Sequence, residues 1–248
     1  MRTKPALLLG ICLAAAAPAQ EPWRPSIGYP SLPPFAASAN AFAPHGWTVE
    51  TQARGDLNGD GAADLVFVLL APDMPGAPRR SSRYDSDASA YANPRILGIA
   101  LARRAGGYRL VLNNHSFLPP KWAPNGASQG WMLFEDGSVD ASAGRLRIEF
   151  QYTRAHQTYT FRWQDGALRL IGFDSGGVTG GCMNYLSINF LTHRARMEAG
   201  WVDRDGGPTG WRRLAPRPLL TIDQIGDGQE FDPHRLVSRF PLRCPNRT

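Results

Sequence analysis

Polar and apolar side chains alternate without a break in Arg145-Leu146-Arg147-Ile148-Glu149-Phe150-Gln151-Tyr152. In an extended strand neighbouring side chains point to opposite faces, so Leu, Ile, Phe and Tyr form one apolar face. The same pattern returns in Thr158-Tyr159-Thr160-Phe161-Arg162-Trp163. Two half-buried strands this close together in the chain predict an antiparallel sheet that covers a hydrophobic core on one side.

Further segments of strand character lie on both sides of this pair. Residues 47–52 alternate, and residues 65–70 are a continuous apolar run, which is typical of a buried strand. Beyond the first twenty residues we find no helical pattern, and short strands are separated by hairpin turns. We therefore predict an all-β chain: an antiparallel meander of about 10–12 strands, arranged as propeller-blade-like sheets or as a β-sandwich. The other predicted strands are 96–101, 108–112, 131–134, 167–173, 185–191, 194–201 and 219–222.

The first nineteen residues have the three parts of a signal peptide. Arg2 and Lys4 precede an uncharged run at 6–16, and Ala17-Pro18-Ala19 follows as a small-x-small cleavage pattern. The apolar run is too short to cross a bilayer as a helix. We expect cleavage after Ala19 and a periplasmic or extracellular mature protein. A membrane anchor and a lipoprotein modified at Cys12 are the alternatives.

Composition divides the rest of the chain into three parts. Residues 20–46 are rich in Pro and Ala and predict an extended N-terminal arm. Residues 47–202 hold almost all of the predicted strands and form the expected all-β domain. Residues 203–248 contain many prolines and predict an irregular tail that packs on this domain.

Two cysteines, Cys182 and Cys244, remain after removal of the signal peptide. In an oxidising compartment two cysteines favour one disulfide, which would tie the tail to the domain. Two free thiols are the alternative. The net charge of +6 comes from dispersed arginines, not from a basic cluster with interleaved aromatics, so we exclude nucleic acid as a partner.

A single acidic loop offers oxygen ligands at short intervals, in Asp56-Leu57-Asn58-Gly59-Asp60-Gly61-Ala62-Ala63-Asp64. Calcium takes six to eight hard oxygen ligands, and we expect one calcium ion here. The spacing matches the first part of an EF-hand loop. However, Phe67 stands at the twelfth position, where an EF-hand loop needs a bidentate Glu. Predicted strands, not helices, flank the loop, so it is not an EF-hand. The alternative is an acidic turn without an ion. The expected ligands are the side chains of Asp56, Asn58, Asp60 and Asp64 and the carbonyl of Ala62.

This loop between two strands resembles the calcium loop of FG-GAP and VCBS-type repeats, the blades of integrin-like propellers. The resemblance covers residues 55–70 and extends loosely to residue 112. It implies the same five ligands. Because only one such loop is present, a complete propeller is not implied. Together with 94–97, 159–162, 170–175 and 187–192, the loop also resembles an uncharacterised family of bacterial secreted proteins with one acidic loop and a β meander.

No arrangement of residues indicates catalysis. Gly172-Phe173-Asp174-Ser175-Gly176-Gly177 is similar to the serine motif of trypsin-like proteases, but Phe173 interrupts it. We interpret it as the end of a strand followed by a glycine loop. The leading hypothesis is a non-catalytic calcium-binding module of the cell envelope that contacts a protein or polysaccharide there. A hydrolase with a loop-borne site is one alternative. The other is a carbohydrate-binding module using Trp122 and Trp131.

Overall fold

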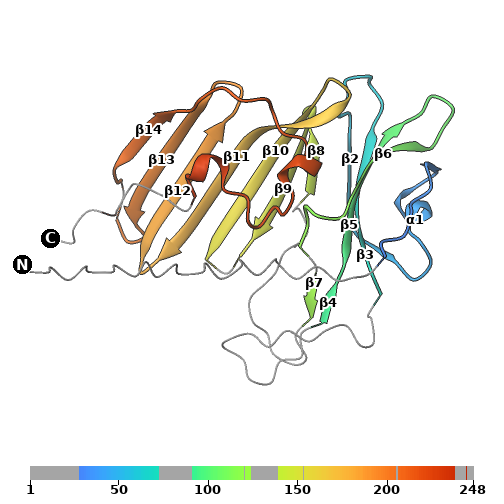
Figure 1. Cartoon of the computed structure of the whole chain (residues 1–248), viewed down its shortest axis with the longest axis horizontal. Helices are drawn as coiled ribbons and strands as arrows, with labels where there is room; N and C mark the ends of the chain where they lie inside the picture. The colour runs from blue at the N-terminus through green and yellow to red at the C-terminus, as the bar shows by residue number, and fades with distance from the viewer. Residues whose placement is uncertain are drawn as a thin grey trace, which may run out of the picture.

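The computed structural model confirms the all-β prediction, with two antiparallel sheets. It describes residues 28–72, 91–119, 121–123, 139–152, 154–204, 206–237 and 244. The sheets have five strands, in the order β1-β6-β5-β3-β2, and seven strands, in the order β14-β13-β12-β11-β10-β9-β8; β4 (Tyr91–Asn93) and β7 (Lys121–Ala123) form a separate ribbon. In Figure 1 the seven-stranded sheet faces the viewer, and the five-stranded sheet stands nearly edge-on beside β8.

The five-stranded sheet is buried on both faces at its centre. The strands predicted at 47–52, 65–70, 96–101 and 108–112 are all present in it. Along β3, Val66 and Val68 pack toward the other sheet, whereas Phe67 stacks on Phe42 of the short helix α1 (Ala39–Phe42) on the opposite side. This double burial explains the continuous apolar run. The strands are β1 (Phe35–Ala36), β2 (Thr48–Gly55), β3 (Asp64–Leu70), β5 (Arg95–Ala102) and β6 (Tyr108–Asn114).

The seven-stranded sheet is a meander in which each strand pairs with the next along the chain. Three of its turns have two residues, both at positive φ: Ala143-Gly144, Asp165-Gly166 and Gly180-Gly181. Such turns match the twist of antiparallel strands. The strands are β8 (Val139–Ser142), β9 (Arg145–Gln151), β10 (Ala155–Gln164), β11 (Ala167–Thr179), β12 (Cys182–Asn189), β13 (Arg194–Trp201) and β14 (Thr209–Arg213).

The expected glycine loop after Phe173 is wrong, because β11 continues through Gly176 and Gly177 to Thr179. The alternation of β9 and β10 is confirmed: Ile148, Phe150 and Tyr159 are fully buried, whereas Arg145 and Arg147 are exposed. The main core lies between the two sheets, where Phe117 makes edge contacts with Tyr159 and Phe161.

The C-terminal segment 214–237 lies across the core face of the seven-stranded sheet (Figure 1). Leu214, Ile222 and Leu236 are buried there, and Phe231 contacts the rings of Tyr159 and Phe173. The strand predicted at 219–222 is wrong. Thr221 makes one bridge to Arg169, and the chain then turns into α2 (Ile222–Ile225). A capping interaction favours the helix, since the side chain of Gln224 accepts the N–H of Thr221 at 2.9 Å. The 3-10 helix η1 (Pro233–Arg235) follows.

The predicted arm is packed where it is described. From residue 28 onward it contributes Leu32, Ala39 and Phe42 to the core on the outer side of the five-stranded sheet. Within the described ranges, none of the helices has the length and apolar character needed to cross a membrane. The predicted signal peptide and the strand predicted at 131–134 lie outside the described residues.

Candidate metal site

The acidic loop closes the hairpin between β2 and β3, where Gly55 pairs with Asp64. Gly59 and Gly61 have φ values of 79° and 84°, a left-handed conformation that glycine adopts without steric cost. These two glycines let the chain reverse direction while its side-chain oxygens turn inward onto the backbone. The loop is therefore a folded turn with defined hydrogen bonds.

Asp56 organises the first half of the loop. Its Oδ1 accepts the N–H groups of Gly59 at 2.7 Å and Asp60 at 3.2 Å, and its Oδ2 accepts the N–H of Gly61 at 2.9 Å. Three backbone donors thus converge on one carboxylate. A carboxylate offers about four lone-pair positions, so Asp56 keeps acceptor capacity beyond these three bonds.

Asn58 and Asp60 face each other on the exposed side of the loop. The Asn58 amide nitrogen donates to Asp60 Oδ2 at 3.0 Å, and Asn58 Oδ1 accepts the N–H of Asp60 at 3.0 Å. Asp60 Oδ1 accepts the N–H of Ala62 at 2.9 Å. The hydrogen bond from Ala62 and the one from Asn58 lower the pKa of Asp60. The Asp60 carboxylate therefore stays ionised at neutral pH.

Asp64 has a different setting, because it is fully buried. Its Oδ2 accepts the N–H of Leu57 at 2.9 Å, and its Oδ1 accepts the N–H of Ala102 at 2.9 Å. Burial raises the pKa of Asp64, although these backbone hydrogen bonds oppose the increase. The Asp64 side chain connects the start of the loop to the end of β5.

The structure brings Asp56, Asn58 and Asp60 together in one turn and places Asp64 on the buried side of it. All the predicted ligands are oxygen atoms, which is the donor chemistry that suits a hard cation such as calcium. As the side chains lie, no group of three or more His, Cys, Asp or Glu in the described part of the chain is gathered as a metal site. Calcium binding at this loop therefore remains a prediction.

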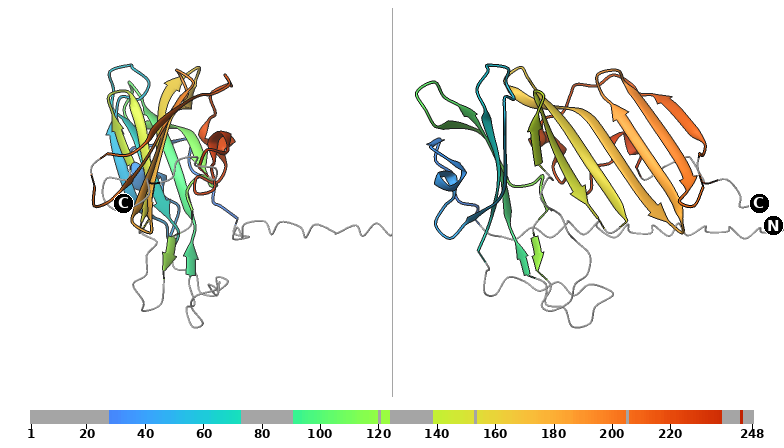
Figure 2. Two further views of the ribbon diagram at one scale, coloured as in Figure 1. Left: turned by 90° about the vertical axis from the view of Figure 1, so that its left-hand side faces the viewer. Right: turned by 180° about the vertical axis from the view of Figure 1, so that it is seen from behind.

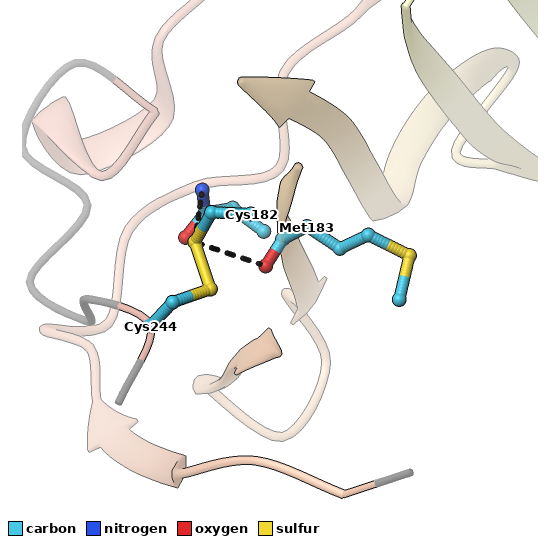
Figure 3. Close-up of a disulfide and its surroundings, with 4 residues drawn as sticks. Cys182, Met183 and Cys244 are labelled. Carbon is cyan, nitrogen blue, oxygen red and sulfur yellow. Dashed lines mark hydrogen bonds between the residues drawn. A yellow bond between two sulfur atoms is a disulfide. The ribbon is translucent and has the colours of Figure 1, made fainter. Parts of the chain in front are cut away.

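The cysteine pairing predicted from sequence is present in the structure. Cys182, the first residue of β12, forms a disulfide with Cys244, and their Cα atoms are 5.9 Å apart (Figure 3). Neighbouring residues of a strand point to opposite faces. Since Leu186 belongs to the core, Cys182 and Asn184 share its face, and Met183 and Tyr185 point away from the core.

The sequence also offered a pair of tryptophans and a protease-like motif as candidates. Trp131 lies outside the described residues, and Trp122 lies in the β4–β7 ribbon. Asp174 accepts the hydroxyl of Tyr185 at 2.9 Å from the face of β11 opposite to Phe173. Ser175 points to the core face beside Phe173, so the protease-like motif does not place a serine beside a base.

A groove of about 650 Å³, not predicted from the sequence, lies at one end of the seven-stranded sheet. His156, Tyr185 and Glu198 line it from three different strands. These residues are far apart in the sequence, and only the register of the strands places them in one row. One signal for this groove was present in the sequence: β11 is a strand with several glycines that still alternates between apolar and polar residues.

Comparison with protein-family models, with curated proteins and with solved structures gave no match for this chain.

Proposed function

We propose that this chain is an exported, non-catalytic β protein that binds one calcium ion in the loop 56–64 and serves as a binding or structural module of the cell envelope. One observation carries the proposal: the side-chain oxygens of Asp56, Asn58 and Asp60 are held together in a single tight turn. Such a set of oxygen atoms, on a turn rich in glycine, is the chemistry that calcium favours.

The electrostatics of the loop favour a cation. Asp56, Asp60 and Asp64 bring three carboxylates into nine residues, and the charge of Asp60 raises the pKa of Asp64 as a minor contribution beside burial. A divalent cation at the loop would relieve this repulsion. We expect a dissociation constant on the order of 10⁻⁴ to 10⁻³ M, which is usual for extracellular calcium modules.

The position of the loop suggests what the ion would do. Asp64 is hydrogen-bonded to the N–H of Ala102, so the loop is connected to the end of β5 as well as to β2 and β3. An ion bound here would stabilise three adjacent strands at one edge of the core. The ion would therefore make the fold more rigid, and the binding surface of the module would lie elsewhere.

Two features support export. The N-terminal pattern ending at Ala19 is that of a signal peptide, and the Cys182–Cys244 disulfide is of a kind that persists in oxidising compartments. We expect the exported protein to begin at Gln20. Mass spectrometry of protein collected outside the cytoplasm tests this, and an intact Met1 or a lipid on Cys12 would contradict it.

The test of the metal site is thermal unfolding of the mature protein in calcium and in chelator. Calcium at about a hundred times its dissociation constant should add roughly 2.7 kcal/mol to stability. Asp60→Ala should abolish this calcium-dependent increase. Asp140→Ala, at an exposed carboxylate of β8 bonded only to Ser142 in the described structure, is the matched control and should keep it. Equal melting temperatures of the wild-type protein in calcium and in chelator would rule out the calcium site.

A further inference from the structure

The face of the seven-stranded sheet that points away from the core, which we call the open face, carries a continuous row of polar residues. The strand register aligns one residue from each of six neighbouring strands. Neighbouring strands are about 4.8 Å apart, so five spacings give a row of about 24 Å. The row is Gln151, His156, Gly176, Tyr185, Glu198 and Thr209.

A polar outward face is ordinary for an antiparallel sheet, but this one is hollowed. The groove of about 650 Å³ follows the row, and its size lies within the usual range of small-molecule sites. The C-terminal segment 214–237 covers the opposite face. Viewed from behind, in the right-hand panel of Figure 2, no segment of the described chain lies across the open face.

Glycines make the groove. A Cβ atom on Gly176 would lie 2.6 Å from Cε1 of His156, so the imidazole occupies the space that a side chain at 176 would fill. On β13, Gly200 lies beside the carbonyl oxygen of Gly206, in the connection to β14 that lines the groove. A larger residue at position 176 would collide with the His156 imidazole, and one at position 200 would press against the carbonyl of Gly206.

Two aromatic side chains line the groove. The rings of His156 and Tyr185 are 6.4 Å apart between centroids and tilted by 38°. The Tyr185 hydroxyl donates to Asp174 Oδ1 at 2.9 Å, which fixes the direction of the phenol. Burial and the neighbouring Asp174 raise the pKa of Tyr185, so the phenol is neutral at physiological pH.

Charged side chains that donate or accept hydrogen bonds lie around the two rings. Glu198 supplies a carboxylate and is paired with Arg196, while Arg154 and Arg204 bring guanidinium groups to the margins of the groove. The lining thus holds two guanidinium groups and one carboxylate, which disfavours a cation as ligand. Hydroxyl groups suit such a lining, because each hydroxyl both donates and accepts hydrogen bonds.

We propose that the groove along His156, Tyr185 and Glu198 binds a carbohydrate chain, with sugar rings against the rings of His156 and Tyr185 and hydroxyls bonded to the charged groups around them. The length of the row accommodates more than one sugar unit. This inference deepens the proposed function by naming the ligand class, and it rests on that function only for the cell envelope as the place of encounter.

The experiment is a binding screen of the mature wild-type protein against soluble neutral glycans (β-glucan, mannan, chitin oligomers) and one acidic glycan (alginate), followed by calorimetry. We expect saturable binding of at least one of them. Glu198→Gln and Tyr185→Ala should each weaken that binding about tenfold or more, since each removes groups that contact the ligand. Arg147→Ala is the control, because Arg147 is exposed on β9 outside the residues that line the groove.

The outcomes separate this inference from the calcium site. If no glycan binds at millimolar concentration, or if the groove variants bind as well as Arg147→Ala does, the carbohydrate proposal is wrong. A persisting calcium-dependent stabilisation would then leave the proposed function intact. Should Tyr185→Ala fail to fold, Glu198→Gln, which preserves size, still decides the matter.

Discussion

Gly55 of β2 lies so close to Ala141 of β8 that a Cβ atom on Gly55 would come within 1.8 Å of the Ala141 carbonyl oxygen. These two residues belong to different sheets, and their contact marks where the five-stranded sheet meets the edge of the seven-stranded one. Because the close neighbour is backbone, a rotamer change cannot relieve the clash. Packing between the two sheets therefore requires glycine at position 55, directly before the acidic loop.

Gly55→Ala should therefore destabilise the protein, by about 1–3 kcal/mol as for other overpacked sites. Urea unfolding measures the change. The control is Gly28→Ala, since a Cβ at Gly28 meets no atom within 4 Å and its φ is not in the left-handed region. If both variants unfold at the same urea concentration, the two sheets do not approach each other as described.

Glu50 and Arg95 form a buried ion pair that should make stability depend on pH. Arg95 Nε and Nη2 donate to the two carboxylate oxygens at 2.6 and 2.7 Å, and the side chains are only 2% and 9% exposed for Arg95 and Glu50. Burial alone would raise the pKa of Glu50, but the hydrogen bonds and charges of Arg95 and Lys121 outweigh it and lower the pKa.

A carboxyl group whose pKa is lowered by folding stabilises the protein above its unfolded pKa, and this contribution is lost as pH falls through the folded value. Glu50→Gln should cost about 3–5 kcal/mol at pH 7, because it removes the carboxylate charge from a buried ion pair. The difference from wild type should shrink below the ordinary pKa of 4.5. Glu230→Gln, at an exposed residue, is the control. A difference that does not change between pH 7 and pH 3 would contradict this account.

Tyr159 anchors the C-terminal segment to the core. Its hydroxyl donates to the carbonyl oxygen of Gly228, and its ring contacts Phe231. Tyr159→Phe keeps the ring but leaves the buried carbonyl without this donor, at a cost of about 1–3 kcal/mol. Limited proteolysis should then cut more readily within 214–237. Unchanged cleavage and unchanged stability would show that the segment is held without this bond.

The Cys182–Cys244 disulfide closes a separation of 62 residues, so its removal should cost about 2–4 kcal/mol. The paired variant Cys182→Ser with Cys244→Ser measures this by chemical unfolding. Thiol counting on the exported protein under denaturing, non-reducing conditions should find no free thiol. Two titratable thiols in each chain would show that the pair stays reduced.

Periodicity predicted the longer strands, but not the short strands β1, β4, β7, β8 and β14, and not which strands pair. Residues 145–152 and 158–163 alternate, and both are strands with the predicted faces. By contrast, residues 219–224 combine apolar residues with a capping signature, and the cap decided the local structure in favour of a helical turn. A short apolar segment in a proline-rich tail does not reveal which tendency prevails.

The acidic loop could likewise be predicted only in part. Its turn and its glycines follow from the sequence, and so does the grouping of Asp56, Asn58 and Asp60. The burial of Asp64 and its bond to Ala102 depend on β5 lying beside β3, thirty-eight residues later in the chain. The groove is harder still, since its row joins residues from six strands, and one residue of slip in any pairing would turn a member to the other face.

The cross-link between β12 and Cys244 also imposes an order on maturation. Cys244 follows every strand of both sheets in the chain, so the bond can close only after all of them have been synthesised. The bond therefore joins the last described residue of the chain to a strand whose neighbours in both sheets already exist as chain. Cys182 is the first residue of the strand that carries Tyr185. The disulfide therefore lies behind the groove, on the opposite face of the sheet, and constrains the end of a strand that lines it.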